Sequence, residues 1–156
     1  MIPESKLIKS ESIVRDMQLT EEVKMTKRSL IRWIALSLGL ISPKESRQSI
    51  LALLEALLYY HLKVKKEPNY EEIQEYLKSK GEEINEKTIR YHLTNLRKIG
   101  IIENRRGCYV FTNFTFGIES LSKTFEKTYN EKLRKAFSNI SLAFDTLSKM
   151  YEEEKK

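Results

Sequence analysis

The stretch that most constrains the fold runs from Ile84 to Phe111 and reads INEKTIRYHLTNLRKIGIIENRRGCYVF. Asn85 is a good helix N-cap, because its side-chain oxygen can accept hydrogen bonds from the free N–H groups of a first turn. Ile89, Leu93 and Leu96 follow at the spacing of three and four residues that gives a helix one buried stripe. Gly100 can end the helix, since glycine takes a left-handed conformation easily. The pattern predicts an amphipathic helix between Asn85 and Gly100.

Strand character follows this helix at once. Ile101-Ile102 and the residues from Cys108 to Phe111 are rich in β-formers, and the polar residues from Asn104 to Gly107 separate them. The sequence therefore predicts a hairpin with a turn at residues 104–107 that carries two arginines. A helix followed by such a hairpin suits a DNA duplex, with the helix in the major groove and the tip on the backbone or minor groove.

The stretch resembles the recognition helix and wing of winged helix-turn-helix transcription regulators, which commonly show the phrase K-T-V-R-Y-H-L, then L, then G-L-I. Here the likeness is carried by Lys87 to Leu93, by Leu96, by Gly100 to Ile102 and by the arginine wing, and it spans roughly residues 44–112. The resemblance implies a mainly α fold with a small β-hairpin wing, of the small archaeal or bacterial type with added dimerisation helices. It implies sequence-specific binding of double-stranded DNA. The same fold also serves as a protein-docking module, which remains the alternative function.

The candidate DNA contacts lie on the face opposite the predicted apolar stripe and at the hairpin tip. Arginine can bond guanine in bidentate fashion and asparagine can do the same for adenine, whereas lysines near the helix ends suit phosphates. Arginine also inserts well into a narrow minor groove. An ordinary solvated helix face is the competing interpretation. The candidates are Lys87, Thr88, Arg90, Tyr91, Thr94, Asn95, Lys98, Arg105 and Arg106.

The charge distribution favours an acidic partner. The chain has a formal net charge of +6 and a pI near 9.3. Residues 84–112 hold six cations and two acids, so +4 of the +6 lies in this stretch. The local excess is more informative than the total, because a high content of Lys and Glu is also common in thermophile proteins.

The pattern divides the chain into an N-terminal helical segment (1–41), a winged helix-turn-helix domain (42–112) and a C-terminal dimerisation helix (113–156). In the first part we expect a weak helix around Ile8 to Leu19 and a second helix from Lys27 to Leu38, capped by Thr26. The second helix is apolar on almost all sides and contains Trp33. It either packs on the helix that follows or forms a subunit interface.

A capping box and a second cap predict the next helices. Ser42-Pro43-Lys44-Glu45 predicts a helix that runs to about Lys63. Asn69, with Glu72 three residues later, predicts a short helix that ends at Gly81.

A long helix is predicted from Ile118 to about Glu153. It would be about 50 Å long, too long for one small domain to cover, and therefore needs a partner helix. Two copies could pair through it and set two recognition helices at half-site spacing, or it could fold back on the Leu30 to Leu38 helix. A ligand pocket lined by Tyr129, Phe137 and Phe144 is a further alternative to simple packing. The apolar positions, spaced almost as in a coiled coil, are Ile118, Leu121, Phe125, Tyr129, Leu133, Phe137, Ile140, Phe144, Leu147 and Tyr151.

Motifs of catalysis and targeting are missing from the sequence. It holds no glycine-rich phosphate loop, HExxH, CxxC or nucleophile elbow, and His61 and His92 lack metal-ligand spacing. We therefore expect no enzymatic activity, cofactor or metal. A single cysteine, Cys108, favours a reducing compartment. Without a signal-peptide core or a membrane span, we expect a cytoplasmic protein.

Overall fold

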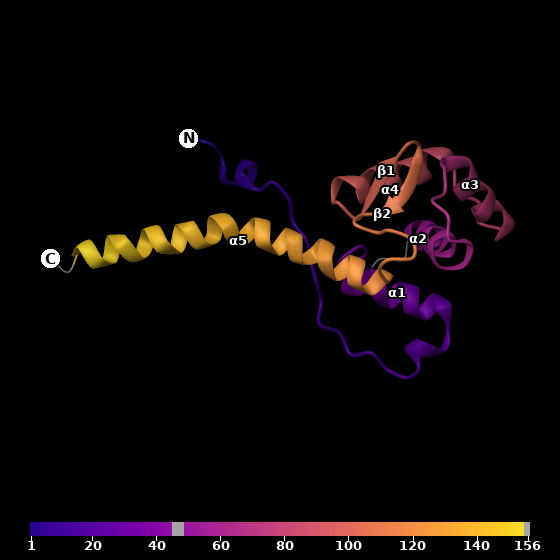
Figure 1. The fold of residues 1–156 in the computed structure, drawn as a ribbon, viewed down its shortest axis with the longest axis horizontal. Coiled ribbons are helices and arrows are strands. Elements are labelled where there is room, and N and C mark those ends of the chain that lie inside the picture. The colour runs from indigo at the N-terminus through magenta and orange to yellow at the C-terminus, as the bar shows by residue number, and fades with distance from the viewer. Residues whose placement is uncertain (45–48, 155–156) are drawn as a thin grey trace. The chain divides into compact units, whose positions relative to one another are not determined.

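The computed structural model describes residues 1–44 and 49–154 and divides into two compact units, Met1–Thr112 and Asn113–Lys156 (Figure 1). The predicted mainly α fold with a small hairpin is confirmed. Short 3₁₀ turns lie at Glu4–Leu7 and Val23–Met25, and a π-helical turn at Tyr60–Val64. The main elements are α1 (Lys27–Ser37), α2 (Ser49–Tyr59), α3 (Tyr70–Ser79), α4 (Glu86–Lys98), β1 (Ile102–Arg105), β2 (Cys108–Phe111) and α5 (Leu121–Glu154).

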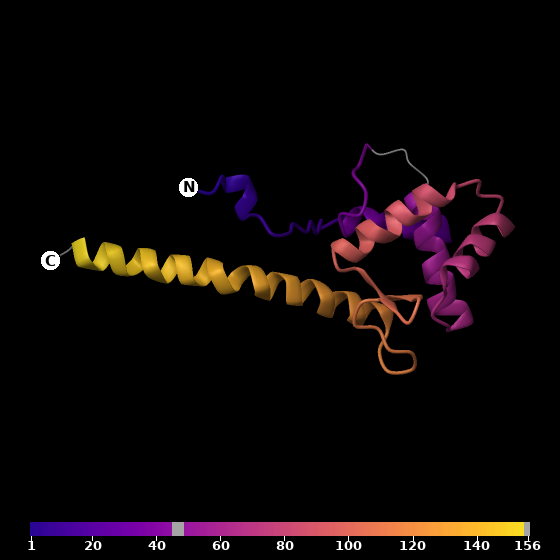
Figure 2. The ribbon, with the colours of Figure 1, turned by 90° about the horizontal axis from the view of Figure 1, so that it is seen from above.

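The core of the first unit forms around α2, which contacts α1, α3 and α4 (Figure 2). This helix is apolar on more than one face, so it can be covered from several sides at once. Strands β1 and β2 pair antiparallel, from Ile102 opposite Phe111 to Arg105 opposite Cys108. The most deeply buried large side chains are Leu53, Leu57, Ile73, Leu77, Ile89, Leu93, Ile101, Ile102, Val110 and Phe111.

Local capping signals locate three of the helix starts. The Asn69 side chain accepts from the backbone N–H of Glu72, which is the predicted cap, and the Glu72 carboxylate accepts in turn from the backbone N–H of Asn69, which completes a capping box. Thr26 and Asn85 cap α1 and α4 in the same way, through the N–H groups of Ser29 and Thr88. These predictions are confirmed because each cap depends on residues only three positions apart.

The hairpin turn is shorter than the sequence predicted. Residues 104 and 105 belong to β1, and only Arg106 and Gly107 form the turn, with φ of 54° and 83°. A two-residue turn with positive φ at both positions matches the right-handed twist of the strands. The Asn104 side chain stabilises it by accepting from the N–H of Gly107 at 2.9 Å. Arg106 is therefore the arginine at the tip, and Arg105 is the last residue of its strand.

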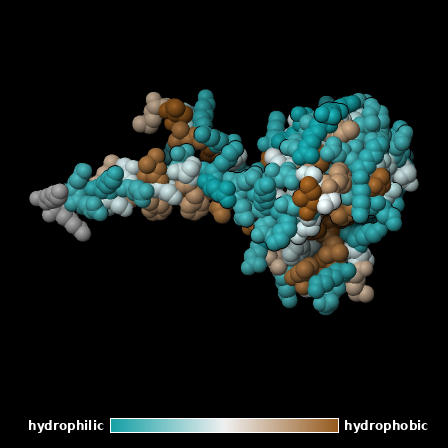
Figure 3. Space-filling view, viewed as in Figure 1, coloured by the Kyte–Doolittle hydropathy of each residue, from teal (hydrophilic) through white to brown (hydrophobic). Residues whose placement is uncertain are grey.

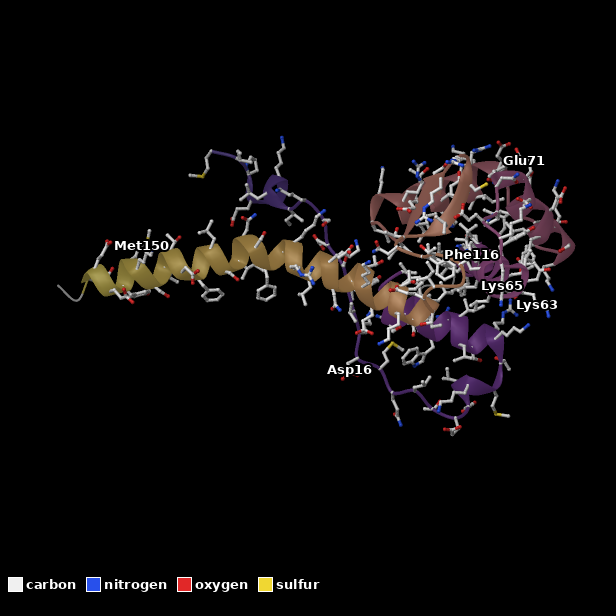
Figure 4. All side chains as sticks on the ribbon, viewed as in Figure 1. Asp16, Lys63, Lys65, Glu71, Phe116 and Met150 are labelled. Atoms are coloured by element: carbon white, nitrogen blue, oxygen red, sulfur yellow. The ribbon has the colours of Figure 1, made fainter. Side chains whose placement is uncertain are left out.

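Helix α2 continues into the π-helical turn Tyr60–Val64, which ends close to the end predicted for this helix at Lys63. Lys65 follows in the left-handed conformation, with φ of 63°. Its neighbour Lys66 then donates its backbone N–H to the carbonyl of Tyr60, and this hydrogen bond closes the turn. Lys63 and Lys65 are both exposed there (Figure 4). The capping box predicted for this helix includes Glu45, which lies outside the described residues.

The helix predicted around Ile8 to Leu19 is wrong. No helix is described over residues 8–20; instead Arg15 makes contacts with the end of α1. Its guanidinium donates to the carbonyls of Leu36 at 2.6 Å and Ile41 at 3.1 Å, and its backbone N–H donates to Ser37 at 2.8 Å. Carbonyls at a helix end lack partners within the helix, so the segment gains more by bonding to them than by forming a weak helix.

The second unit is dominated by α5, which begins at Leu121 rather than at the predicted Ile118. Ser120 caps it by accepting from the N–H of Lys123 at 3.2 Å. Ile118 lies before the cap and is exposed. Hydrophobic side chains lie on the surface of the helix (Figure 3). No helix in the described part of the chain has the length and apolarity needed to cross a membrane.

Candidate nucleic-acid interface

The buried face of α4 fixes which of its side chains are free to contact a ligand. Ile89, His92, Leu93 and Leu96 are buried. The side chains that share the other face of the helix are therefore presented to solvent. The exposed candidates are Lys87, Arg90, Tyr91, Thr94 and Lys98, whereas Thr88 and Asn95 are half-buried.

Arg90 is held in place by two neighbours. Its Nε donates to Glu86 Oε1 at 2.9 Å, one helical turn earlier, and its guanidinium lies 4.0 Å from the centroid of the Tyr70 ring. The hydrogen bond that Arg90 donates to Glu86 raises the pKa of Arg90, so the guanidinium remains charged. The side chain is still about half exposed, at 53%. A guanidinium stacked on an aromatic face keeps free N–H groups at its edge.

Tyr70 and Glu86 are the residues that sequence reasoning missed. Tyr70 is buried, and burial raises the pKa of its hydroxyl. This hydroxyl has no hydrogen-bond partner among the described residues. The Glu86–Arg90 pair could have been predicted from its spacing of four residues. The contact with Tyr70 could not, because Tyr70 belongs to a different helix.

The base of the hairpin is anchored beside the N-terminus of α3. Tyr109 donates its backbone N–H to the carbonyl of Pro68 at 2.8 Å, and Asn69 pairs with Cys108 in an isolated bridge. Tyr109 also acts electrostatically on Tyr70 and Arg90 and contributes to the raised pKa of each, after the larger effects of burial and of Glu86 respectively. Tyr70, the first residue of α3, therefore links the α3 N-terminus, where the hairpin is anchored, to Arg90 of α4.

His61 joins the end of α2 to the same hairpin. Its Nε2 accepts from the backbone N–H of Phe111 at 3.2 Å, so the ring proton is on Nδ1, which donates to the carbonyl of Leu57 at 2.7 Å. The ring also packs on Phe111, with centroids 4.5 Å apart. Burial lowers the pKa of His61, which favours this neutral form. The histidine is structural and faces the core.

The two wing arginines differ in their surroundings. Arg105 is half-buried; it donates to Glu103 at 2.6 Å and to Glu67 at 3.5 Å. Arg106, at the turn, is exposed and makes no ion pair with any described residue. Arg106 is therefore the wing cation best placed to meet a phosphate or a groove.

Ion pairing concentrates the remaining charge on four side chains. The two acids of residues 84–112, Glu86 and Glu103, are each bonded to one arginine. Within the part of the chain that the structure describes, the other cations of this stretch make no ion pairs and are exposed. They are Lys87, Arg97, Lys98 and Arg106. Over the described residues, no group of three or more His, Cys, Asp or Glu could hold a metal ion.

The comparison with protein families agrees with this geometry. A model of the ribonuclease R winged-helix domain matches residues 57–121, from the last part of α2 to the first residue of α5. The domain is a winged helix. This match does not single out transcription regulators among winged-helix proteins. Comparison with curated proteins gave no match, and neither did comparison with solved structures.

Proposed function

We propose that the chain is a dimeric, sequence-specific, double-stranded DNA-binding transcription regulator that uses α4 as its recognition helix and the β1–β2 hairpin as its wing. The observation that carries the proposal is the exposed cationic face of α4 beside an arginine-tipped hairpin. Phosphate contacts from exposed cations supply most of the affinity of such proteins and make it dependent on salt. Base contacts supply the choice of sequence.

Within this proposal, the residues of α4 divide between two roles. Lys87 and Lys98 lie near opposite ends of the helix and bond phosphates, as Arg106 does at the wing. Arg90 and Thr94 are exposed and read base edges, with Asn95 between them and the core. Glu86 and Tyr70 hold the Arg90 guanidinium, which reduces the side-chain entropy lost when it meets a base.

The dimer is assigned to α5. Its distal half exposes large apolar side chains that a partner helix would cover, such as Phe137 at 50% and Phe144 at 66% exposed. The Trp33 helix is a weaker candidate for the interface, because the indole N–H already donates to the carbonyl of Gln18 at 2.9 Å within the chain.

The matched family favours a second candidate, in which the winged domain contacts RNA. The model that matches residues 57–121 describes a domain of a ribonuclease. The deep, narrow major groove of duplex RNA does not admit a helix, so an RNA ligand would be bound by its backbone or as a single strand. The exposed cations of α4 and the wing suit phosphates of either nucleic acid.

Direct titration separates these candidates. Fluorescence anisotropy of the full chain against labelled duplex DNA, duplex RNA and single-stranded RNA of one length, at several salt concentrations, gives the affinity and salt slope for each. The proposal expects duplex DNA to bind most tightly, with a slope that Lys98→Ala lowers by about 1. Tighter binding of RNA would favour the second candidate. Weak binding of all three would instead favour protein docking.

A further inference from the structure

The distal half of α5 carries an apolar stripe that no other described residue of its own unit covers. Its members recur at intervals of 4, 3, 4, 3 and 4 residues, the spacing of a coiled-coil seam. Their side chains are between 39% and 66% exposed. They form the α5 stripe, which consists of Leu133, Phe137, Ile140, Phe144, Leu147 and Tyr151.

The α5 stripe has an internal order that the spacing alone does not require. If Phe137 occupies position a of the heptad, every a position is aromatic and every d position is aliphatic. The series of intervals is also the same when it is counted from either end. A helix with this pattern can therefore meet a reversed copy of itself with every a position opposite a d position.

We propose that a second copy of this chain lies antiparallel on the α5 stripe, centred on Leu142. The proposal rests on the dimer of the proposed function and deepens it by assigning orientation and register. Each layer of the seam then joins one aromatic and one aliphatic side chain. The layers pair Leu133 with the partner's Tyr151, Phe137 with the partner's Leu147, and Ile140 with the partner's Phe144.

Packing distinguishes this arrangement from a parallel pair. In a parallel coiled coil each side chain meets its own equivalent, so Phe137 and Phe144 would each face another phenylalanine while Ile140 would face another isoleucine. Layers of two aromatic rings would alternate with layers of two aliphatic side chains, and their widths would differ. The antiparallel arrangement gives six layers of nearly equal width, which two regular helices fill without gaps or strain.

The flanks of the stripe favour the same orientation. The g positions Ala136, Ala143 and Met150 are apolar, whereas the e positions are Arg134, Ser141 and Ser148. In an antiparallel pair, g positions flank g positions and e positions flank e positions, so the apolar flanks meet each other. In a parallel pair, each apolar g position would flank a polar e position. Met150 projects from the helix near its end (Figure 4).

Few charges flank the stripe. In this heptad frame Arg134 occupies an e position, whereas Lys135, Glu152 and Glu153 fall at f, b and c and face away from the seam, all of them exposed. The choice of orientation therefore rests on the layers and on the apolar flanks.

The arrangement has a measurable consequence for α5. Leu121 lies 21 residues before Leu142. At a rise of about 1.5 Å per residue, the first residues of the two α5 helices would be about 60 Å apart. A parallel pair would instead bring them within the contact distance of two helices, about 10 Å between axes.

The first test is the mass of the full chain in solution by light scattering, for the parent and two matched variants. Leu147→Asp places a charge in the stripe, and Leu142→Asp places the same charge on the opposite face, where Leu142 is 63% exposed. We expect the parent and Leu142→Asp to be dimers and Leu147→Asp to be a monomer with unchanged helix content by circular dichroism. A monomeric parent, a larger oligomer, or equal loss of mass in both variants would overturn the proposal.

The second test measures orientation directly. A spin label at Lys127→Cys, in a Cys108→Ser background, lies on the exposed surface of α5 outside the stripe. An antiparallel pair predicts a distance between labels of about 45 Å by pulsed electron paramagnetic resonance. A distance below about 25 Å would indicate parallel helices and contradict the assignment. Neither test involves nucleic acid, so the pairing can fail while DNA binding stands, and DNA binding can fail while the pairing stands.

Discussion

Helices α4 and α5 use the same apolar spacing with opposite results. In α4 the stripe of Ile89, Leu93 and Leu96 is between 1% and 3% exposed, whereas in α5 the corresponding side chains Phe137, Phe144 and Leu147 are between 48% and 66% exposed. A period of three to four residues predicts that a face is to be buried, but not what buries it. For α4 the cover is the rest of its own unit, whereas the unit that contains α5 supplies no such cover.

The difference lies in length and neighbours. Helix α4 has 13 residues and packs against α2 and β1, so its whole apolar face meets the core. Helix α5 has 34 residues, which at about 1.5 Å each exceeds what a domain of this size can cover. Burial of the α4 stripe therefore stabilises the fold, and burial of the α5 stripe remains available for association.

The largest expected effect separates the two stripes by their contribution to folding. Leu93→Ala removes a buried side chain from α4 and should lower the free energy of unfolding by about 2–5 kcal/mol. Leu147→Ala should leave the first unit within about 0.5 kcal/mol of the parent. Trp33 is the single tryptophan and lies in the first unit, so urea unfolding followed by its fluorescence reports on that unit. Equal losses in the two variants would remove the distinction between the helices.

The next effect concerns the exposed faces of the two helices. Arg90→Ala should cost about 1–3 kcal/mol of affinity for a preferred duplex and relax its sequence specificity, because a base contact is lost. Lys98→Ala should weaken binding to all sequences alike, and Lys135→Ala, on the exposed surface of α5, should change neither property. Anisotropy titrations against preferred and random duplexes measure these losses. Undiminished discrimination in Arg90→Ala would exclude this arginine as a base reader.

A smaller effect is expected at the start of α4. Asn85→Ala removes the bond to the N–H of Thr88 and should lower the free energy of unfolding by about 1 kcal/mol. Asn85→Ser keeps an oxygen that can cap the helix and serves as the control. Urea unfolding of both variants measures the difference, and indistinguishable midpoints would mean that the cap does not contribute.

The smallest effect is a dependence of the free energy of unfolding on pH near neutrality. It is expected in the first unit, since both histidines lie there and α5 has none. Burial lowers the pKa of His61 from 6.5; the hydrogen bond to Leu57 and the charge of Glu67 oppose this, and Arg105 adds to it. The unfolded chain therefore binds the proton more readily, so the stabilisation is complete above about pH 6.5 and is lost as the pH falls below it.

Urea midpoints from about pH 7.5 to about pH 5.5 test this dependence. In His61→Gln the amide oxygen can still accept from the N–H of Phe111, but the side chain does not titrate. His92 is unchanged in both proteins, so the difference in slope isolates His61. If the urea midpoint changes with pH equally in the parent and in His61→Gln, then the titration of His61 does not cause the pH dependence.

The sequence predicted best where the signal and its effect are close together in the chain. The caps at Thr26, Asn69 and Asn85 act over three residues, and the structure confirms all three. Gly100 likewise follows the end of α4, with φ of 78°. Winged-helix architecture follows from such local signals because they occur in the right order along the chain.

The sequence predicted poorly where a distant residue decides. The extended path of residues 8–20 depends on bonds from Arg15 to the end of α1, which no local pattern reveals. At the candidate site, the exposed face of α4 was predictable from its period. The stacking of Arg90 on Tyr70 and the pairing of Arg105 with Glu67 were not, because each joins residues that are far apart in the sequence.

Selection of binding sites from random duplex DNA tests the central claim most directly, when it is carried out in parallel with the full-length parent and with Arg90→Ala. If α4 reads base edges through Arg90, the parent should enrich one defined sequence and the variant should lose the preference for at least one base pair within it. If the parent enriches no sequence, or if both proteins enrich the same one equally, then α4 is not a recognition helix that uses Arg90.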